Sequence, residues 1–355
     1  LEDLVALNAL YRPGPMDQIP HFIDRKFGRE EVEYLDQRME PILRETYGIM
    51  VYQEQVMLVA RAIGGYSLGG ADLLRRAMGK KNVEEMKRQR AVFIKGAAER
   101  NVDEKTATDI FNLMEKFAGY GFNKSHAAAY SFVAWQTAYL KVHHPGPFFA
   151  GNLCLVMDQG EKMSVLINDA KECGVTFLSP DVNVSDWFFT VPDEHTIRMG
   201  MGSIKGMSQN IVEDILEERS VNGMFLDIFD LAARVPTVNR KTLEQLVRSG
   251  ALDSLDSNRG KNFANIHQAL QAAQTVKASV GQVSLFADEN GEAERIVSWV
   301  QAPAWNEKQR LQGEIDAFGF CFTGNLFDYY RTELSAFTTP LANVRDNRQA
   351  MTIAG

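Results

Sequence analysis

Residues 117–131 read FAGYGFNKSHAAAYS, and this stretch decides how the first part of the chain folds. Glycines stand on either side of Tyr120 and permit a backbone conformation that other residues rarely adopt. Ser125 is predicted to cap a helix that continues through a largely apolar run to His143. The stretch therefore predicts a tight corner that joins two helices.

The same corner carries side chains that suit a nucleotide. Lys124 and His126 lie next to the predicted cap, and a helix N-terminus with a nearby cation attracts phosphate. Tyr120 or Tyr130 offers an aromatic face on which a base can stack. The alternative is a structural corner in which the histidine and the tyrosines pack against their own neighbours. The residues alone leave both interpretations open.

Residues 68–81 read LGGADLLRRAMGKK and gather cations around the end of another predicted helix. We expect this helix to run from Asp72 to Met78 and to stop at Gly79. The alternative to a binding site is a solvated surface whose cations complement the negative end of the helix dipole. Forked guanidinium donors and ammonium groups at this density nevertheless suit a triphosphate, and the candidates are Arg75, Arg76, Lys80 and Lys81.

The wider pattern predicts a mainly α-helical protein. Residues 1–172 are mostly helical, with further helices expected from Met50 to Ile63 and from an Asp103 cap to Lys116. Between 173 and 200, short β-branched and aromatic runs predict a small sheet, at Trp187–Val191 and Thr196–Met199. Helical patterns then resume at about 200–280 and 305–318, Phe320 to Thr323 reads as extended, and an all-β element starts at Thr338.

Residues 197–208 read IRMGMGSIKGMS and precede an amphipathic helix expected from Gln209 to Glu218. A glycine turn that opens a helix exposes backbone amides that can hold a DNA phosphate, and a lysine adds charge. The pattern resembles a helix-hairpin-helix, with a second unit at 238–252, although Ser208 stands where a further hairpin glycine is expected. The alternative is a structural connector between helices. The candidate DNA contacts are Gly200, Gly202, Lys205, Gly206, Arg240 and Lys241.

Residues 282–286 read QVSLF and precede an acidic stretch that offers little to bury their apolar side chains. Leu285 and Phe286 can fill an apolar pocket on a partner, while the Gln282 amide can hydrogen-bond the rim and fix the register. The alternative is a short edge strand that folds back onto its own domain. QVSLF resembles the pentapeptide with which bacterial replication proteins bind the ring-shaped sliding clamp.

Further runs, taken in order, resemble one family: LNALYRPGPM at 7–16, GIMVYQEQ at 48–55 and YLKVHHP at 139–145. With the stretches above, they resemble the fingers domain of the bacterial DNA polymerase III alpha subunit, the C-family replicative polymerase. The similarity extends over nearly all 355 residues. It implies fingers at 1–172, a clamp-binding domain at 173–337 with a helix-hairpin-helix region at about 197–255, and the start of a truncated OB-fold at 338–355.

The resemblance also implies roles for the candidate residues. Arg75 and Arg76 would face the triphosphate of the incoming deoxynucleotide, with Lys80 and Lys81 nearby. The nucleotide and template side of the cleft would be lined by Tyr120, Lys124, Ser125, His126 and Tyr130. The implied partners are primer–template DNA, deoxynucleoside triphosphates, the sliding clamp and other replicase subunits, with no membrane.

The family holds its catalytic magnesium ions with Asp residues of a palm domain upstream of the fingers. This chain contains no Asp-x-Asp, and its aspartates near the predicted boundary are scattered, namely Asp169, Asp181, Asp186 and Asp193. We therefore expect no catalytic or metal-binding residue here, and no polymerase activity from this piece alone. Two rival interpretations are a non-catalytic adaptor that tethers a DNA-binding module to the clamp, and an error-prone paralogue of the same polymerase.

The resemblance implies a bacterial cytoplasmic protein that works near the nucleoid, and the cysteine usage fits a reducing cytoplasm. The formal charge of −8 argues against a surface coated with basic groups, although nine Lys or Arg from Arg75 to Arg100 face only three Glu. The three cysteines are far apart and indicate neither a disulfide framework nor a zinc site. No apolar run is long enough for a membrane span, and the chain lacks an initiator Met, so we expect an internal piece of a longer protein.

Overall fold

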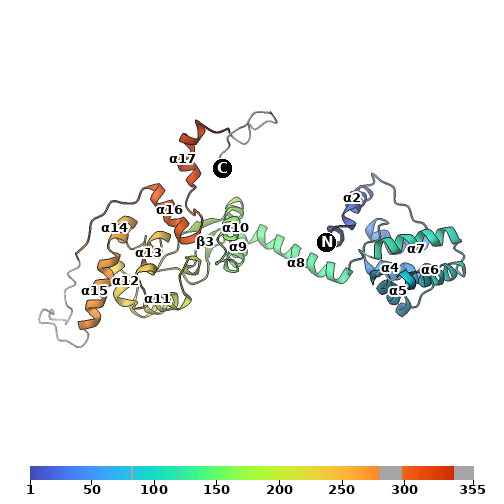
Figure 1. The fold of residues 1–355 in the computed structure, drawn as a ribbon, viewed down its shortest axis with the longest axis horizontal. Coiled ribbons are helices and arrows are strands. Elements are labelled where there is room, and N and C mark those ends of the chain that lie inside the picture. Colours follow the sequence, from blue (N-terminus) through green and yellow to red (C-terminus); the bar gives the residue numbers. More distant parts are fainter. Residues whose placement is uncertain (81–82, 119, 280–297, 340–355) are drawn as a thin grey trace. The chain divides into compact units, whose positions relative to one another are not determined.

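The computed structural model describes residues 1–80, 83–118, 120–279 and 298–339 of the chain (Figure 1). Among these residues it has 17 α-helices and one three-stranded sheet, so the predicted mainly α-helical class is confirmed. The chain divides into two compact units, Leu1–Tyr139 and Leu140–Gly355, each with its own hydrophobic core. The division falls inside helix α8, Lys124–His143, whereas the fingers domain was expected to end at residue 172. A compact unit and a functional domain need not coincide, so the domain limits stay a prediction.

The first unit is organised around α4, Gln53–Gly64, which contacts the three helices that follow it: α5 (Leu68–Lys80), α6 (Val83–Ala98) and α7 (Glu104–Ala118). Val59 and Ile63 of α4 are fully buried because they lie on the face that these helices cover. A Cβ atom at Gly96 would lie 2.0 Å from the Gly64 carbonyl oxygen, so α4 and α6 approach closely where both lack side chains. The unit also contains α1 (Glu2–Leu10), α2 (Ile19–Lys26) and α3 (Glu40–Leu43).

Two of the expected helix limits differ from those observed. The helix expected from Met50 begins at Gln53, because the residues just before it pair in an extended conformation with Phe122. The expected stop at Gly79 is wrong, since α5 starts at Leu68 and continues through Lys80. A glycine ends a helix by adopting a left-handed conformation, and Gly79 is not among the glycines with positive φ. The Asp103 cap is confirmed, because its carboxylate accepts from the Thr106 amide at 2.9 Å.

The second unit contains the predicted small sheet. Strand β1, Thr176–Leu178, pairs in parallel with β3, Thr196–Arg198. Strand β2, Thr190–Asp193, pairs antiparallel with the other edge of β3, which gives the order β1-β3-β2. Ile197 at the centre of β3 is fully buried. The sheet therefore places the residues that follow β3, where the glycine turn begins, against a fixed core.

Helix α9 packs on the sheet, and helices make up most of the rest of this unit. Helix α12 packs on α15, and α13 packs on α16. No helix within the described ranges is long and apolar enough to cross a membrane. The helices of this unit are α9 (Pro145–Cys154), α10 (Gly160–Glu172), α11 (Gln209–Asn222), α12 (Ile228–Arg234), α13 (Arg240–Ser249), α14 (Arg259–Ala264), α15 (Ile266–Ser279), α16 (Glu307–Phe318) and α17 (Leu326–Ser335).

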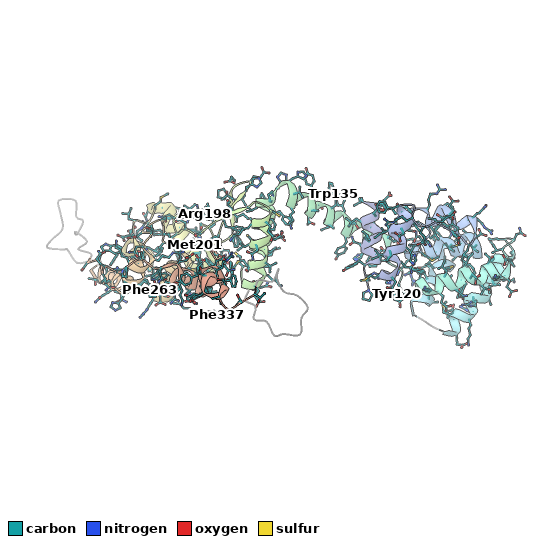
Figure 2. The ribbon with its side chains drawn as sticks, turned by 90° about the horizontal axis from the view of Figure 1, so that it is seen from above. Tyr120, Trp135, Arg198, Met201, Phe263 and Phe337 are labelled. Atoms are coloured by element: carbon teal, nitrogen blue, oxygen red, sulfur yellow. The ribbon has the colours of Figure 1, made fainter. Side chains whose placement is uncertain are left out.

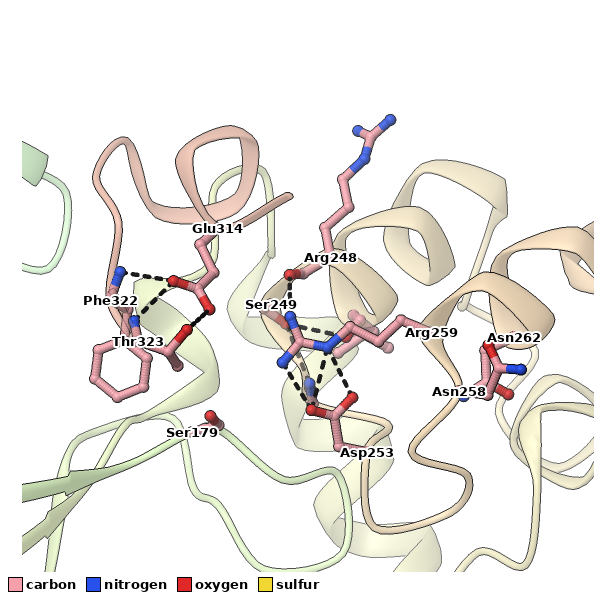
Figure 3. Close-up of polar contacts among 12 residues, drawn as sticks. Ser179, Arg248, Ser249, Asp253, Asn258, Arg259, Asn262, Glu314, Phe322 and Thr323 are labelled. Carbon is pink, nitrogen blue, oxygen red and sulfur yellow. Dashed lines mark hydrogen bonds and ion pairs between the residues drawn. The ribbon is translucent and has the colours of Figure 1, made fainter. Parts of the chain in front are cut away.

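A buried carboxylate fixes the chain after α16 (Figure 3). Glu314 is fully buried and accepts from the Phe322 amide at 2.7 Å and from the Thr323 amide at 2.8 Å. It also accepts from the Thr323 hydroxyl at 2.5 Å. The extended stretch expected at Phe320–Thr323 is therefore wrong: the backbone bends around this carboxylate, which satisfies amides that a strand would have directed to a neighbour.

An ion pair with a buried arginine fixes the turn after α13 (Figure 3). Arg259 is 6% exposed and donates to Asp253 through Nη2 at 2.7 Å. The same guanidinium donates to the Arg248 carbonyl at 3.2 Å. Gly250 ends α13 in a left-handed conformation, and a Cβ atom there would lie 2.2 Å from Arg259 Nη2. The turn is thus built so that the arginine can pass close to the backbone.

Candidate nucleotide and nucleic-acid interface

The glycine-rich corner, residues 120–126, docks on the chain just before α4. The Phe122 amide donates to the Val51 carbonyl at 3.2 Å, and the Gln53 amide donates to the Phe122 carbonyl at 2.9 Å. These bonds make a short parallel bridge between Tyr52 and Phe122. The corner between α7 and α8 that the sequence predicted is therefore present, and its position is set by backbone pairing.

The cap of α8 is Asn123, so the expectation that Ser125 caps this helix is wrong. Asn123 Oδ1 accepts from the His126 amide at 2.8 Å, while Ser125 already lies inside α8. Both residues are good caps, and the docked Phe122 places the asparagine at the first non-helical position.

A carboxylate already occupies the N-terminus of α8. Glu54 Oε2 accepts from the Lys124 amide at 3.1 Å, and Glu54 Oε1 accepts from Asn123 Nδ2 at 3.1 Å. The Lys124 ammonium is 2.6 Å from Glu45 Oε2. The amide and the ammonium of Lys124 are thus engaged by internal carboxylates, and a phosphate that used them would have to exchange with Glu54 and Glu45.

Tyr120 is held by the loop after α1. Gly14 has φ +107°, and a Cβ atom there would lie 2.4 Å from Tyr120 Cε1. Arg12 donates to the Tyr120 carbonyl at 2.6 Å, and its guanidinium lies 4.5 Å from the centroid of the Phe122 ring. Burial lowers the pKa of the Arg12 guanidinium. Arg12 and Gly14 therefore fix an aromatic ring that is 44% exposed (Figure 2).

A row of rings starts at Phe122, just before α8, and continues along the first turns of the helix. The centroids of Phe122 and His126 are 5.4 Å apart, and those of His126 and Tyr130 are 4.6 Å apart. Tyr130 is 61% exposed and lies one helical turn beyond His126. Both candidate residues therefore share one exposed face, as the spacing of four residues predicts.

The two arginines of α5 differ in their surroundings. Arg75 is 27% exposed and donates to Asp72 Oδ1 through Nε at 3.0 Å and Nη2 at 2.8 Å. Its Nη1 donates to Gln53 Oε1 at 2.9 Å. Arg76 is 64% exposed and meets Asp72 Oδ2 through Nε at 2.8 Å. Among the described residues the Arg76 guanidinium forms no other hydrogen bond or ion pair.

The structure brings these arginines and the glycine-rich corner together. Gln53 Nε2 donates to the Gly121 carbonyl at 2.9 Å, while Gln53 Oε1 accepts from Arg75. The hydrogen bonds from Arg75 are the main cause that lowers the pKa of Asp72. The sequence analysis missed Gln53, Glu54, Arg12 and Asp72 as members of this site, although it quoted the runs 7–16 and 48–55 that contain three of them.

In the second unit, the glycine turn lies between β3 and α11, and Figure 2 labels Arg198 and Met201 at its start. Gly200 and Gly202 have packing roles: a Cβ atom would lie 2.4 Å from the Trp187 carbonyl oxygen at the first and 2.7 Å from the Trp187 ring at the second. Gly206 has φ +75°, and a Cβ atom there would lie 3.4 Å from Lys241 Cε. The two predicted hairpin units are therefore neighbours.

The donors of this turn divide into engaged and exposed groups. The Lys205 amide donates to the Ala317 carbonyl at 2.8 Å. Within the described chain, the amides of Gly206 and Ser208 donate to no acceptor, and the Ser208 side chain does not cap α11. Lys205, Arg240 and Lys241 are exposed, and Arg240 pairs with Glu244 at 2.9 Å. The turn therefore combines two open backbone donors with exposed ammonium groups.

Some predicted residues lie outside the described residues. These are Lys81, the pentapeptide with Gln282, Leu285 and Phe286, and the expected OB-fold start beyond residue 339. Lys80 ends α5, and its side chain also lies outside the description.

Comparison with known proteins identifies the class. Residues 1–101 match the finger domain of the bacterial DNA polymerase III alpha subunit, and residues 174–262 match a helix-hairpin-helix motif. Both resemblances expected from the sequence are thus confirmed. The chain therefore carries a polymerase finger domain followed by a helix-hairpin-helix domain.

The relatives extend this assignment to the whole chain. It is 44% identical to the DNA polymerase III subunit alpha of Vibrio cholerae over 100% of its length, and 46% identical to that of Neisseria meningitidis over 94%. Identity to the Escherichia coli subunit is 44% over 95% of the chain. The chain spans 32%, 29% and 30% of these proteins, respectively. Over its whole length the chain is therefore similar to one part of DNA polymerase III alpha subunits.

The contact between Gly14 and Tyr120 predicts an unusually costly glycine substitution. Gly14→Ala should lower the free energy of unfolding by about 3 kcal/mol, because backbone strain and overpacking against the ring add. Gly28→Ala is the matched control, since Gly28 has φ +69° but no heavy atom within 4 Å of an added Cβ. It should cost about 1 kcal/mol from strain alone. Chemical denaturation followed by circular dichroism measures the free energy of unfolding of both variants. Equal losses would show that the Tyr120 ring moves aside at no cost.

Proposed function

We propose that this chain forms the fingers and the duplex-binding part of a replicative DNA polymerase, which extends a primer on a template from deoxynucleoside triphosphates. The observation that carries the proposal is the hydrogen-bond link, through Gln53, between Arg75 of α5 and the glycine-rich corner, within a chain similar throughout to polymerase alpha subunits. The proposed setting is the bacterial cytoplasm, near the nucleoid. The proposed partners are primer–template DNA, the sliding clamp and other replicase subunits.

Nucleotidyl transfer uses magnesium ions held by converging carboxylates. Across residues 1–80, 83–118, 120–279 and 298–339, no group of three or more His, Cys, Asp or Glu residues is placed to hold a metal ion. We assign to this chain the binding and orientation of substrates, and we assign the metal ions to other residues of the complete polymerase.

For the nucleotide, we propose that Arg76 contacts the triphosphate, with Lys80 and Lys81 nearby. Its exposed guanidinium suits phosphate oxygens, whereas Arg75 is engaged by Asp72 and Gln53 and supports it. The ring row of His126 and Tyr130, with Tyr120, supplies faces for base stacking. Lys124 and Ser125 would act at this face only after a ligand exchanges with Glu45 and Glu54.

For DNA, we propose that the glycine turn holds one backbone phosphate of a duplex. The amides of Gly206 and Ser208 can donate to its oxygens, and Lys205 and Lys241 add positive charge. Gly200 and Gly202 shape the turn by close packing. Arg240 can contact the same DNA backbone. Contacts of this kind read the backbone and not the sequence.

For the clamp, we propose that residues 282–286 bind its apolar pocket through Leu285 and Phe286, with Gln282 at the rim. The support is the residue pattern and its resemblance to the clamp-binding pentapeptide. The same resemblance favours the replicative polymerase over an error-prone paralogue.

The nucleotide proposal predicts a selective kinetic defect. In the complete polymerase, Arg76→Ala should raise the KM for deoxynucleotides about tenfold, since one charge-assisted hydrogen bond is lost, while primer–template affinity stays unchanged. Arg44→Ala is the matched control, because Arg44 is 73% exposed and forms the same i,i+4 ion pair, with Glu40. If DNA affinity falls while the nucleotide kinetics stay normal, Arg76 contacts DNA and not the nucleotide.

The duplex proposal predicts a change in salt dependence. Lys205→Ala and Lys241→Ala should each reduce the slope of log affinity against log salt by about one, irrespective of DNA sequence. Lys162→Ala, which removes an exposed cation of α10, should leave the slope unchanged. Fluorescence anisotropy with labelled duplex at several salt concentrations measures the slopes. Wild-type slopes in both hairpin variants would make the turn a structural connector.

The clamp proposal is tested with a peptide of residues 278–292. It should bind the bacterial sliding clamp, and the double change Leu285→Ala with Phe286→Ala should weaken binding about a hundredfold, because two buried anchors are lost. Ser284→Ala changes a position without an assigned contact and should bind as the native peptide does. A calorimetric titration in which the double variant binds equally well would favour the edge-strand interpretation.

A further inference from the structure

One chain of hydrogen bonds links the glycine-rich corner to Arg76. It begins at the Gly121 carbonyl, which accepts from Gln53 Nε2 at 2.9 Å. Gln53 Oε1 accepts from Arg75 Nη1 at 2.9 Å, and Arg75 donates in turn to Asp72 Oδ1. The other carboxylate oxygen of Asp72, Oδ2, pairs with Arg76 Nε at 2.8 Å. Residues from α4, α5 and the corner thus share one network.

Gln53 connects α4, α5 and the glycine-rich corner through its side chain. A primary amide carries a donor and an acceptor at the same end of the side chain, so it can serve a carbonyl and a guanidinium at once. The corner comes close to it: a Cβ atom at Gly121 would lie 3.1 Å from Gln53 Cγ. Gln53 is also the first residue of α4, and its own amide donates to the Phe122 carbonyl.

The network matters for Arg76 because Arg76 is otherwise unsupported. Its side chain is 64% exposed, and among the described residues Asp72 is its only ion-pair partner. Asp72 is in turn oriented by two donors from Arg75. If Arg75 loses Gln53, the arginine and the aspartate can rotate together, and the direction in which Arg76 presents its guanidinium is no longer fixed.

We propose that Gln53 is a positioning residue for the incoming triphosphate. It does not touch the nucleotide; it holds Arg75 and Asp72 and thereby aims Arg76. The inference rests on the proposed function of Arg76 as the triphosphate contact, and it adds a residue that acts through that arginine.

Steady-state kinetics of the complete polymerase test the proposal. Gln53→Ala should raise the KM for deoxynucleotides about fivefold, less than Arg76→Ala, with kcat and primer–template affinity within about twofold of the native values. Gln53→Glu keeps an acceptor for Arg75 and should recover part of the loss, whereas Gln53→Met, of similar size without polar atoms, should behave as the alanine variant does. Arg61→Ala is the control on α4, because Arg61 is exposed.

Two further measurements separate positioning from a general structural role. Gln53→Ala combined with Arg76→Ala should raise KM no more than Arg76→Ala alone, since residues of one network are not additive. Asp72→Asn breaks the same network nearer to Arg76 and should reproduce the KM defect, which keeps a test available if Gln53→Ala fails to fold. Additive effects, or equal losses of kcat and DNA affinity, would overturn the proposal.

The outcomes also separate this inference from the proposed function. If Arg76→Ala raises KM while Gln53→Ala and Asp72→Asn leave it unchanged, only the positioning role falls. If Arg76→Ala leaves KM unchanged, the nucleotide role of Arg76 fails and the inference falls with it.

Discussion

The backbone bridge between Phe122 and residues 51–53 is the constraint on which the first unit depends. Two hydrogen bonds hold the corner between α7 and α8 against the start of α4. Because Gln53 belongs to this bridged segment and Glu54 follows it, the bridge brings Gln53 to the Gly121 carbonyl and Glu54 to the N-terminus of α8. Without this pairing neither side chain would have its partner, and the arginines of α5 would lose their link to the corner.

The cations of this unit are balanced by internal acids. Asp72 forms ion pairs with both arginines of α5, and Glu45 forms one with the Lys124 ammonium. Glu54 accepts a hydrogen bond from the first amide of α8. Hydrogen bonds from Arg75 hold the pKa of Asp72 below its ordinary value. Exposed ion pairs contribute little stability, so an incoming polyanion can exchange with them at small cost. The acids therefore hold these cations in defined positions.

In the second unit, close packing and backbone hydrogen bonds hold the glycine turn in place. Gly200 and Gly202 let the turn pass against Trp187, and the Lys205 amide is tied to the Ala317 carbonyl at the end of α16. Glu314, one turn earlier on α16, is buried and holds the following bend. The turn is thus anchored on two sides, and the donors left open at Gly206 and Ser208 have fixed directions. Fixed donors are what a backbone phosphate contact requires.

The sequence by itself determined the helical class, the small sheet after residue 173, the Asp103 cap and the resemblance to polymerase fingers with a helix-hairpin-helix. These follow from periodicity, local capping and ordered motifs, which are all written in neighbouring residues. Tertiary structure alone decided that Asn123 and not Ser125 caps α8, that α5 continues past Gly79, and that Lys241 lies beside Gly206. It also decided the roles of Gln53 and Glu54, whose partners lie 68 and 70 residues away along the chain. The reason is physical: local patterns fix which conformations are favourable, but only packing decides which distant donor meets which acceptor.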